Sequence, residues 1–328
     1  MNHTQSLAAS ETAALSDGGK EKRRKGISKR RQKETIFYIA VLAFPVLQFL
    51  IGYVATNFNS VLMAFQEYDF SGGVEAATIR FAGLNNFKRV FELFSGEEFA
   101  QMLLNSTLLY LFSTLLGLLL GIYFSYYIYK KHAGSGFFRI ILLMPSVISG
   151  VVMILSFRFF LDTAYPALLE SLFHKQVQGL LSNSSTDFAA IVCYNLLIGF
   201  GSVVLLFSGT MSGISDEIIE AAELDGANSV KEFFLIVIPM IWPTVITYVI
   251  TGIASYFITD MGLFNLYGDK AESRLWTFGY YLFNNAQGSG AEYQFPVLSA
   301  MGVVFTVIVV PVTFLVKHLL EKFGPKGD

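Results

Sequence analysis

Six long apolar runs constrain the fold of this chain more than any other feature of its sequence. Each holds about twenty residues or more, the length at which a helix crosses a hydrocarbon core of roughly 30 Å. A hydrophobic content of 53% with 15% charged residues is also too apolar for a soluble domain of ordinary composition. The sequence therefore predicts an all-α polytopic membrane protein with six transmembrane helices, at approximately residues 36–57, 103–129, 138–161, 188–212, 241–264 and 295–318.

Lysine and arginine are unevenly distributed over the segments between these runs. If residue 1 is cytoplasmic, sixteen of the 23 basic residues fall on the cytoplasmic side and seven on the outer side, as the positive-inside rule requires. Nine of the sixteen lie in residues 1–35, and without them the two sides are equal. The amino-terminal tail therefore decides the predicted orientation, with both termini in the cytoplasm.

The chain divides at residue 35 into a cytoplasmic basic tail, residues 1–35, and a transmembrane domain, residues 36–328. Residues 1–19 are small and polar without hydrophobic periodicity, which is typical of a disordered segment. The basic run Lys20–Lys33 directly precedes the first apolar run. Nucleic-acid binding is one interpretation of such a run, but this position favours a topogenic anchor that also attracts anionic membrane lipid.

No catalytic or metal-binding set is visible in the sequence. The four histidines are scattered, and the single cysteine, Cys193, lies inside the fourth run, so neither a metal site nor a disulfide framework is predicted. No glycine-rich phosphate-binding loop followed by Lys-Ser or Lys-Thr occurs. The chain is therefore not expected to hydrolyse nucleotide alone or to be an enzyme, and no cofactor is predicted in it.

A polar, acidic segment separates the fourth and fifth runs, and its pattern predicts two short helices. Ser215 is placed to cap the first, which Gly226 would end in the left-handed conformation. Ser229 and Glu232 have the spacing of a capping box for the second. A capped helical elbow on the cytoplasmic side offers a surface that a soluble protein can bind, whereas the alternative is an ordinary solvated loop.

The same segment resembles the EAA loop of permease subunits in binding-protein-dependent ABC importers. Glu220-Ala221-Ala222, three residues, Gly226, nine residues and Ile236-Val237-Ile238-Pro239 follow its spacing. The usual ending is Ile-x-Leu-Pro, so Ile238 is a conservative departure. The resemblance implies a type I importer fold in which loop 213–240 couples the chain to an ATPase through Glu220, Ala221, Ala222, Asp225 and Gly226.

Several polar or small residues lie within the apolar runs, where an unpaired polar group is costly and tends to face a partner or a water-filled path. In the fifth run, Thr247, Thr251, Ser255 and Thr259 recur every four residues and predict one slowly winding polar face, with Asp260 beside it. These hydroxyls can equally bond back to their own helix or join two helices.

The third and fourth runs hold further small and polar residues. The third contains Pro145-Ser146 and Ser149-Gly150, which predict a kink with small residues on one side. The fourth contains Asn195 and, one turn later, Gly199. Asparagine supplies the donor and the acceptor that a sugar hydroxyl requires, and glycine leaves room for a ligand or a neighbouring helix.

After residue 35 the chain looks like a carbohydrate-type permease, close in plan to the larger maltose-permease subunit. In that family a sugar site lies near the middle of the membrane. The resemblance, together with the adjacent Asp260, implies contact positions at Ser146, Gly150, Asn195, Gly199, Thr251, Ser255 and Asp260. The carboxylate of Asp260 could instead pair with a cationic substrate or with a partner subunit.

The resemblance also implies partners and a location. They are a second, different permease subunit, two ATPase subunits that hold ATP and magnesium, and an external solute-binding protein, at a bacterial cytoplasmic membrane. The expected function is import of a sugar or oligosaccharide. Import of a non-sugar solute, a membrane-embedded enzyme and a channel are the alternatives.

Two outer connections complete the expectations. The longest, residues 58–102, contains an amphipathic element at Arg80–Phe91, and similar permeases carry a Gly-Leu-x-Asn-Phe segment there. After the fifth run, relatives often show a Gly-Gly-Pro turn, whereas this chain has Leu266-Tyr267-Gly268-Asp269-Lys270. Contacts of that loop with a binding protein are therefore not transferred to this chain.

Overall fold

The computed structural model describes residues 29–70, 78–288 and 291–325. The chain divides into two compact units, Met1–Asn59 and Ser60–Asp328. Within the described residues, six helices are long and apolar enough to cross a membrane, which agrees with the predicted all-α class. They are Lys33–Met63, Glu97–Tyr129, Gly150–Phe173, Asp187–Met211, Ser229–Ser255 and Glu292–Phe323.

The described residues of the first unit, 29–59, belong to one long helix. Helix α2 (Lys29–Phe49) continues through a π-helical segment, η1 (Leu50–Ala55), into α3 (Thr56–Met63). None of the residues of its apolar window is buried, so its surface is suited to lipid or to another protein. The predicted tail lies outside the described residues as far as residue 28, and its last seven residues are already helical.

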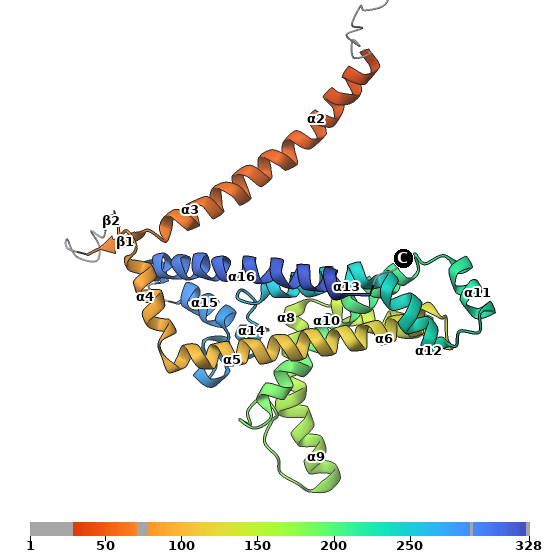
Figure 1. Cartoon of the computed structure of the whole chain (residues 1–328). Helices are drawn as coiled ribbons and strands as arrows, with labels where there is room; N and C mark the ends of the chain where they lie inside the picture. Colours follow the sequence, from red (N-terminus) through yellow and green to blue (C-terminus); the bar gives the residue numbers. More distant parts are fainter. Residues whose placement is uncertain (1–28, 71–77, 289–290, 326–328) are drawn as a thin grey trace, which may run out of the picture. The chain divides into compact units, whose positions relative to one another are not determined.

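In the second unit, long helices pack into a bundle (Figure 1). Helix α10 (Asp187–Met211) lies against α6 (Gly117–Tyr129), α7 (Ser135–Val147) and α13 (Ile238–Ser255), and α13 packs on α16 (Phe295–Phe323). The second span joins α5 (Glu97–Leu111) to α6 through η3 (Phe112–Leu116). The close approach of α10 to α7 requires Gly201, where a Cβ atom would collide with the carbonyl oxygen of Leu142.

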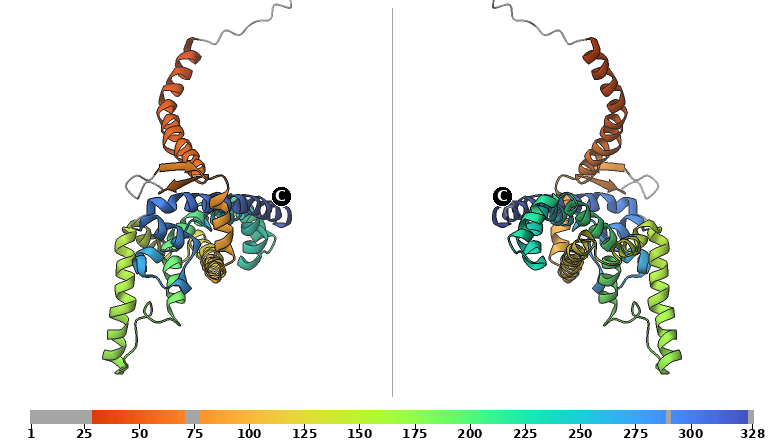
Figure 2. Two further views of the ribbon diagram at one scale, coloured as in Figure 1. Left: turned by 90° about the vertical axis from the view of Figure 1, so that its left-hand side faces the viewer. Right: turned by 90° about the vertical axis from the view of Figure 1, so that its right-hand side faces the viewer.

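The third apolar run is broken rather than kinked. Helix α7 ends at Val147, Ile148 is extended and Ser149 is not helical. Helix α8 (Gly150–Phe159) then begins a separate helix that continues through η4 (Phe160–Ala164) into α9 (Tyr165–Phe173). Pro145 removes one backbone donor from the last turn of α7, and the small residues after it favour the break. The candidate span is therefore Gly150–Phe173 rather than 138–161. Its end, α9, extends away from the bundle (Figure 2).

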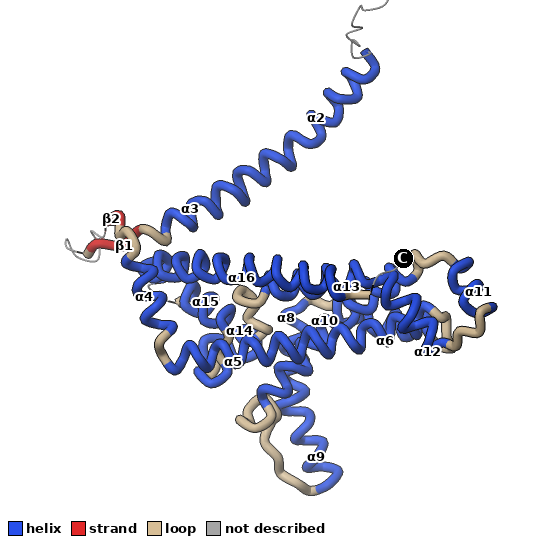
Figure 3. The backbone as a smooth tube through the Cα atoms, viewed as in Figure 1, coloured by secondary structure: helices blue, strands red, loops and turns tan. Residues whose placement is uncertain are grey.

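The fifth span begins and ends earlier than the sequence predicts. Helix α12 (Ser229–Glu232) continues through η5 (Phe233–Val237) into α13, and α13 ends at Ser255. Residues predicted to close this span, Thr259 and Asp260 among them, instead form a turn (Figure 3). That turn leads into four further short elements: α14 (Leu263–Tyr267), η6 (Gly268–Lys270), η7 (Ser273–Leu275) and α15 (Phe278–Gln287), followed by η8 (Ala291–Gln294) before α16.

The long connection before the second span contains a hairpin that the sequence pattern did not predict. Strand β1 (Gln66–Asp69) pairs antiparallel with β2 (Thr78–Phe81), with Gln66 opposite Phe81. Helix α4 (Asn85–Phe94) follows and lies against α16 with Val90 fully buried. The predicted amphipathic element is confirmed, with a helix that begins five residues into it.

Candidate functional site

The polar elbow between α10 and α13 begins with helix α11 (Asp216–Leu224). Asp216 and Glu217 occupy its first turn, where carboxylates stabilise the positive helix end. Ser215 holds the predicted N-cap position, but its side chain makes no capping hydrogen bond. The prediction was therefore correct for the boundary and wrong for the bond.

The end of α11 has the predicted glycine cap. Gly226 has a φ of +79°, its N–H donates to the carbonyl of Glu223 at 3.0 Å, and the N–H of Ala227 donates to the carbonyl of Ala222 at 2.9 Å. These two bonds form a Schellman motif, which satisfies carbonyls that a helix end leaves unpaired. Left-handed geometry at position 226 therefore sets the direction in which the chain leaves α11.

The cap of the following helix differs from the prediction. Asn228, not Ser229, holds the N-cap position, and its side chain accepts a hydrogen bond from the N–H of Lys231 at 2.9 Å. Glu232 does not reach back to the cap but is buried against the end of α6. Asparagine is as good an N-cap as serine, so a shift of one residue is inexpensive. The second elbow helix is also not separate, since it is the first turn of the fifth span.

Glu232 binds one residue of the second span, Tyr126, and the residue that directly follows this span, Lys130. Its carboxylate lies 3.0 Å from Lys130 Nζ and 3.2 Å from the Tyr126 hydroxyl. Lys130 Nζ also lies 3.6 Å from the carboxylate of Glu223 on α11. Burial alone would lower the pKa of Lys130, but the bond to Glu232 and the attraction of both carboxylates raise it above its ordinary value. Lys130 is therefore charged and connects both sides of the elbow.

The five EAA residues lie on the exposed surface of this elbow. Ala222 is half-buried, and the other four are exposed: Glu220, Ala221, Asp225 and Gly226. Leu224 beside them is 89% exposed, whereas Ile214 and Ile219 anchor the elbow in a core with residues of α6, α10 and α13. An anchored helix with an exposed apolar and acidic face is suited to contact with another protein.

Asn195 and Gly199 lie on α10, one turn apart. The side-chain amide of Asn195 donates to the carbonyl of Ile191 at 2.8 Å and to that of Met261 at 2.9 Å. A Cβ atom at Gly199 would meet nothing within 4 Å. Asn195 therefore holds the turn after α13 against α10, and open space lies beside the next turn of the same helix.

Gly150 and Ser146 flank the break in the third run. Ser146 lies in the last turn of α7, and Gly150 is the exposed first residue of α8. Helix α8 contacts α14, and a Cβ atom at Gly262, in the turn before α14, would meet both Tyr194 of α10 and Ile154 of α8. Helices α8 and α10 and this turn thus converge.

The hydroxyls on the polar face of α13 bond back to their own helix, which was the alternative to a ligand-facing surface. The hydroxyls of Thr247, Thr251 and Ser255 donate to carbonyls four residues earlier, at 2.9, 2.8 and 3.1 Å. Thr259 does not continue the face because the helix has already ended. Within the described contacts, Thr251 and Ser255 are not joined to Asn195 or Gly199.

The carboxylate of Asp260 has backbone hydrogen-bond partners in the turn after α13. It accepts hydrogen bonds from the N–H groups of Gly262 and Phe264, each at 3.1 Å. The carboxylate therefore stabilises the start of α14, as acidic caps do. This use accounts for an acidic residue at that position without a ligand.

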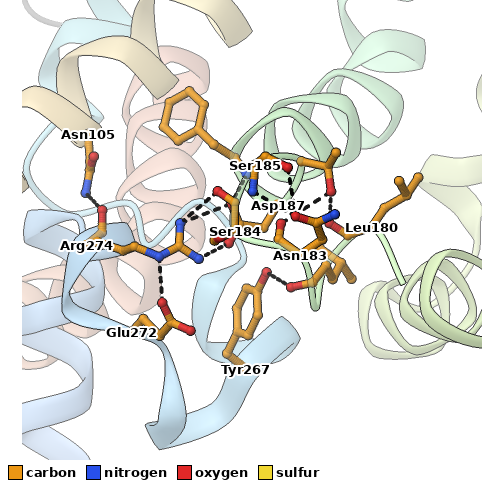
Figure 4. A network of polar contacts seen from close by, with 12 residues as sticks. Asn105, Leu180, Asn183, Ser184, Ser185, Asp187, Tyr267, Glu272 and Arg274 are labelled. Carbon is orange, nitrogen blue, oxygen red and sulfur yellow. Dashed lines mark hydrogen bonds and ion pairs between the residues drawn. The ribbon is translucent and has the colours of Figure 1, made fainter. Parts of the chain in front are cut away.

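Sequence reasoning missed a polar network that fixes the loop after α14 (Figure 4). Asp187, at the start of α10, is 1% exposed and pairs with the guanidinium of Arg274. Arg274 also lies 2.6 Å from Glu272, and its carbonyl accepts from the side chain of Asn105 at 2.7 Å. The hydrogen bond to Asp187 is the largest cause that raises the pKa of Arg274. In the sequence, the only indication of this network was the position of Asp187, an acidic residue directly before the fourth apolar run.

Among the described residues, no group of three or more His, Cys, Asp or Glu side chains is placed to hold a metal ion. Residues 113–325, which include the bundle and the whole elbow, match the family described as binding-protein-dependent transport system inner membrane component. The chain belongs to this family. With six long apolar helices among its described residues, it is a multi-pass membrane protein.

Individual relatives agree with this family. The chain is 31% identical over 196 residues to a probable ABC transporter permease protein of Mycoplasma pneumoniae, covering 57% of this chain and 58% of that relative. It is 26% identical over 245 residues to the multiple sugar-binding transport system permease protein MsmF of Streptococcus mutans, covering 74% and 82%.

A solved structure shows the same fold. A chain of the bacterial alginate ABC transporter, in complex with an alginate pentasaccharide-bound periplasmic protein, is 16% identical and superposes with a TM-score of 0.71. The match covers 92% of this chain and 100% of that chain. At this identity the likeness concerns the fold alone.

Proposed function

We propose that this chain is a membrane permease subunit of an ATP-driven importer for a sugar or oligosaccharide. The observation that carries the proposal is the family match over residues 113–325, which includes an exposed, glycine-capped elbow. The name of the Streptococcus mutans relative, a multiple sugar-binding transport system permease, supports a carbohydrate substrate. The chain itself supplies transport rather than catalysis.

The arrangement around α10 favours a neutral, hydroxyl-rich solute over an ionic one. Gly199 and Gly150 leave open space, and Asn195 is a polar but uncharged neighbour. The carboxylate of Asp260 is occupied by two backbone donors, which weakens the case for a cationic substrate. Weak contacts of this kind suit a transporter, which must release what it binds. Ser146, Thr251 and Ser255 stay proposed contacts from the resemblance alone.

The proposed partners follow from the same function. The elbow would contact one of two ATPase subunits, which hold ATP and magnesium, and a second permease subunit would complete the path. An external solute-binding protein would deliver the sugar, and the periplasmic protein bound to the alginate transporter supports such a partner by analogy. This sequence contains no phosphate-binding loop, so in the proposed complex the partner subunits bind the ATP.

Uptake in the host cell tests the substrate class. Cells that lack this chain should lose uptake of one of three radiolabelled neutral oligosaccharides, maltotriose, raffinose or galactobiose, and a plasmid copy should restore it. Uptake of a labelled amino acid should not change. If all three sugars entered at the wild-type rate while a charged or non-sugar solute did not, the carbohydrate assignment would be wrong.

Substitutions at Asn195 and Gly199 test the proposed site. We expect Asn195→Ala combined with Gly199→Val to lower sugar uptake about tenfold or more, because a hydrogen-bonding group is lost and the open space is filled. The complex should still assemble, which co-purification of the ATPase with the tagged chain would measure. Cys193→Ser, on the same helix, is the matched control. Wild-type uptake in the double variant would place the sugar site in the other permease.

The proposed orientation places the elbow in the cytoplasm and the α4 end outside. In a Cys193→Ser background, a cysteine at Ser215 should resist an impermeant thiol reagent in intact cells, and one at Ser95 should react. Both positions are exposed, so a difference in labelling reports the side of the membrane. Labelling at position 215 from outside would reverse the orientation.

A further inference from the structure

Lys130 contacts the elbow on both of its sides. It follows directly after α6, and its ammonium lies 3.0 Å from Glu232 at the start of the fifth span and 3.6 Å from Glu223 on α11. These two carboxylates come from the two arms that Gly226 separates. A single cation thus fixes both arms to the end of the second span.

The contact to Glu232 is built into the protein interior. The Glu232 side chain is 3% exposed, and that of Lys130 is 21% exposed. The Tyr126 hydroxyl shares its hydrogen between the carbonyl of Ser229 at 3.1 Å and the Glu232 carboxylate at 3.2 Å. A buried carboxylate without its partners is strongly unfavourable. Displacement of the elbow away from α6 is therefore opposed more strongly than displacement of the two together.

Helix α6 in turn contacts the helix that carries Asn195 and Gly199. The fully buried hydroxyl of Ser125, one residue before Tyr126, donates to the carbonyl of Val204 at 3.0 Å. Helices α6 and α10 pack against each other. A contiguous set of packed residues therefore connects the elbow with the proposed sugar site.

We propose that Lys130, with Tyr126, Glu223 and Glu232, forms a clamp that makes the elbow and α6 move as one body, so that displacement of the elbow reaches α10. Lys130 is a positioning residue in this role. The inference rests on the proposed function, because it requires an ATPase that displaces the elbow. Lys130 lies in a different loop from the EAA motif, and Glu232 is one of the nine residues between Gly226 and Ile236 that the motif does not specify.

Cys193 offers a reporter for this movement. It is the single cysteine of the chain and is exposed on α10, two residues before Asn195. The complex that co-purifies with the tagged chain would be held without nucleotide or trapped with ATP, magnesium and vanadate. The rate at which N-ethylmaleimide modifies Cys193 would then be measured by mass spectrometry of this chain, which does not require the sugar to be known.

The double variant Lys130→Met with Glu232→Gln removes the clamp without leaving a buried charge unpaired. We expect the ratio of the two labelling rates to be about fivefold or more in the unmodified complex and to fall below about twofold in the double variant. Lys130→Arg keeps the ion pair and should keep the ratio. Lys131→Met removes the neighbouring exposed charge and should also keep it, which separates the clamp from a general effect of basic residues.

The outcomes distinguish failure of the clamp from failure of the proposed function. A full response in the double variant would overturn the clamp while leaving the proposed function intact. No response in the unmodified complex would contradict the proposed function, and the clamp with it. Should the double variant fail to assemble, Glu223→Gln decides, because it removes the more exposed carboxylate and keeps the buried pair. We expect it to reduce the ratio, and a full response there would contradict a shared clamp.

Discussion

Replacement of Gly226 by leucine should abolish ATP-driven sugar uptake while the chain still inserts in the membrane. The residue has a φ of +79°, a conformation that costs an L-residue with a Cβ atom about 1–2 kcal/mol. Steric conflict is not the cause, because a Cβ atom there would meet nothing within 4 Å. The strain is relieved when the backbone leaves the left-handed region, which breaks the bond between Ala227 and Ala222 and turns the elbow in a new direction.

The measurement is uptake together with substrate-stimulated ATP hydrolysis by the co-purified complex. Gly226→Asn is the matched control, since asparagine tolerates the left-handed conformation better than other residues, and we expect it to retain most of the uptake. Leucine and asparagine have similar size, so the comparison isolates backbone conformation. Normal coupled transport in Gly226→Leu would show that the elbow geometry is not required for coupling.

Local patterns in the sequence predicted the helices and the glycine cap well. Apolar length alone predicted six spans but misplaced the third and the fifth, whereas the position of Gly226 located the end of α11. The N-cap of α12 was predicted one residue too late because two neighbouring polar residues compete for this position. Asn228 directly precedes Ser229, and both are good N-caps. The sequence could not decide between them, since the choice depends on where Glu232 finds its partner.

Long-range contacts account for most of the remaining differences. Glu232 has the spacing of a capping box, but Lys130, 102 residues away, offers a buried charge pair that a local pattern cannot indicate. Arg274 and Asp187 are 87 residues apart. Asp260 is costly in a membrane interior only if the fifth span includes it. Once α13 ends at Ser255, the carboxylate lies in a turn and caps the next helix.

The ion pair between Arg274 and Asp187 should make the largest single contribution to stability in the loop after α14. Removal of Arg274 leaves a carboxylate that is 1% exposed without its main partner. A fully buried pair broken in this way costs about 3–5 kcal/mol. The Arg274 side chain is 37% exposed, so water screens the pair in part, and we expect about 2 kcal/mol for Arg274→Ala.

Thermal unfolding of the detergent-solubilised complex would measure this loss as a lower Tm. Glu272→Gln is the matched control, because Glu272 binds the same guanidinium at 2.6 Å but is 68% exposed, and an exposed pair contributes little. Addition of Asp187→Asn to Arg274→Ala should recover part of the lost stability, since the buried charge is then removed as well. If Arg274→Ala unfolded at the same temperature as Glu272→Gln, the buried carboxylate would have another source of stabilisation, and the loop after α14 would not depend on this pair.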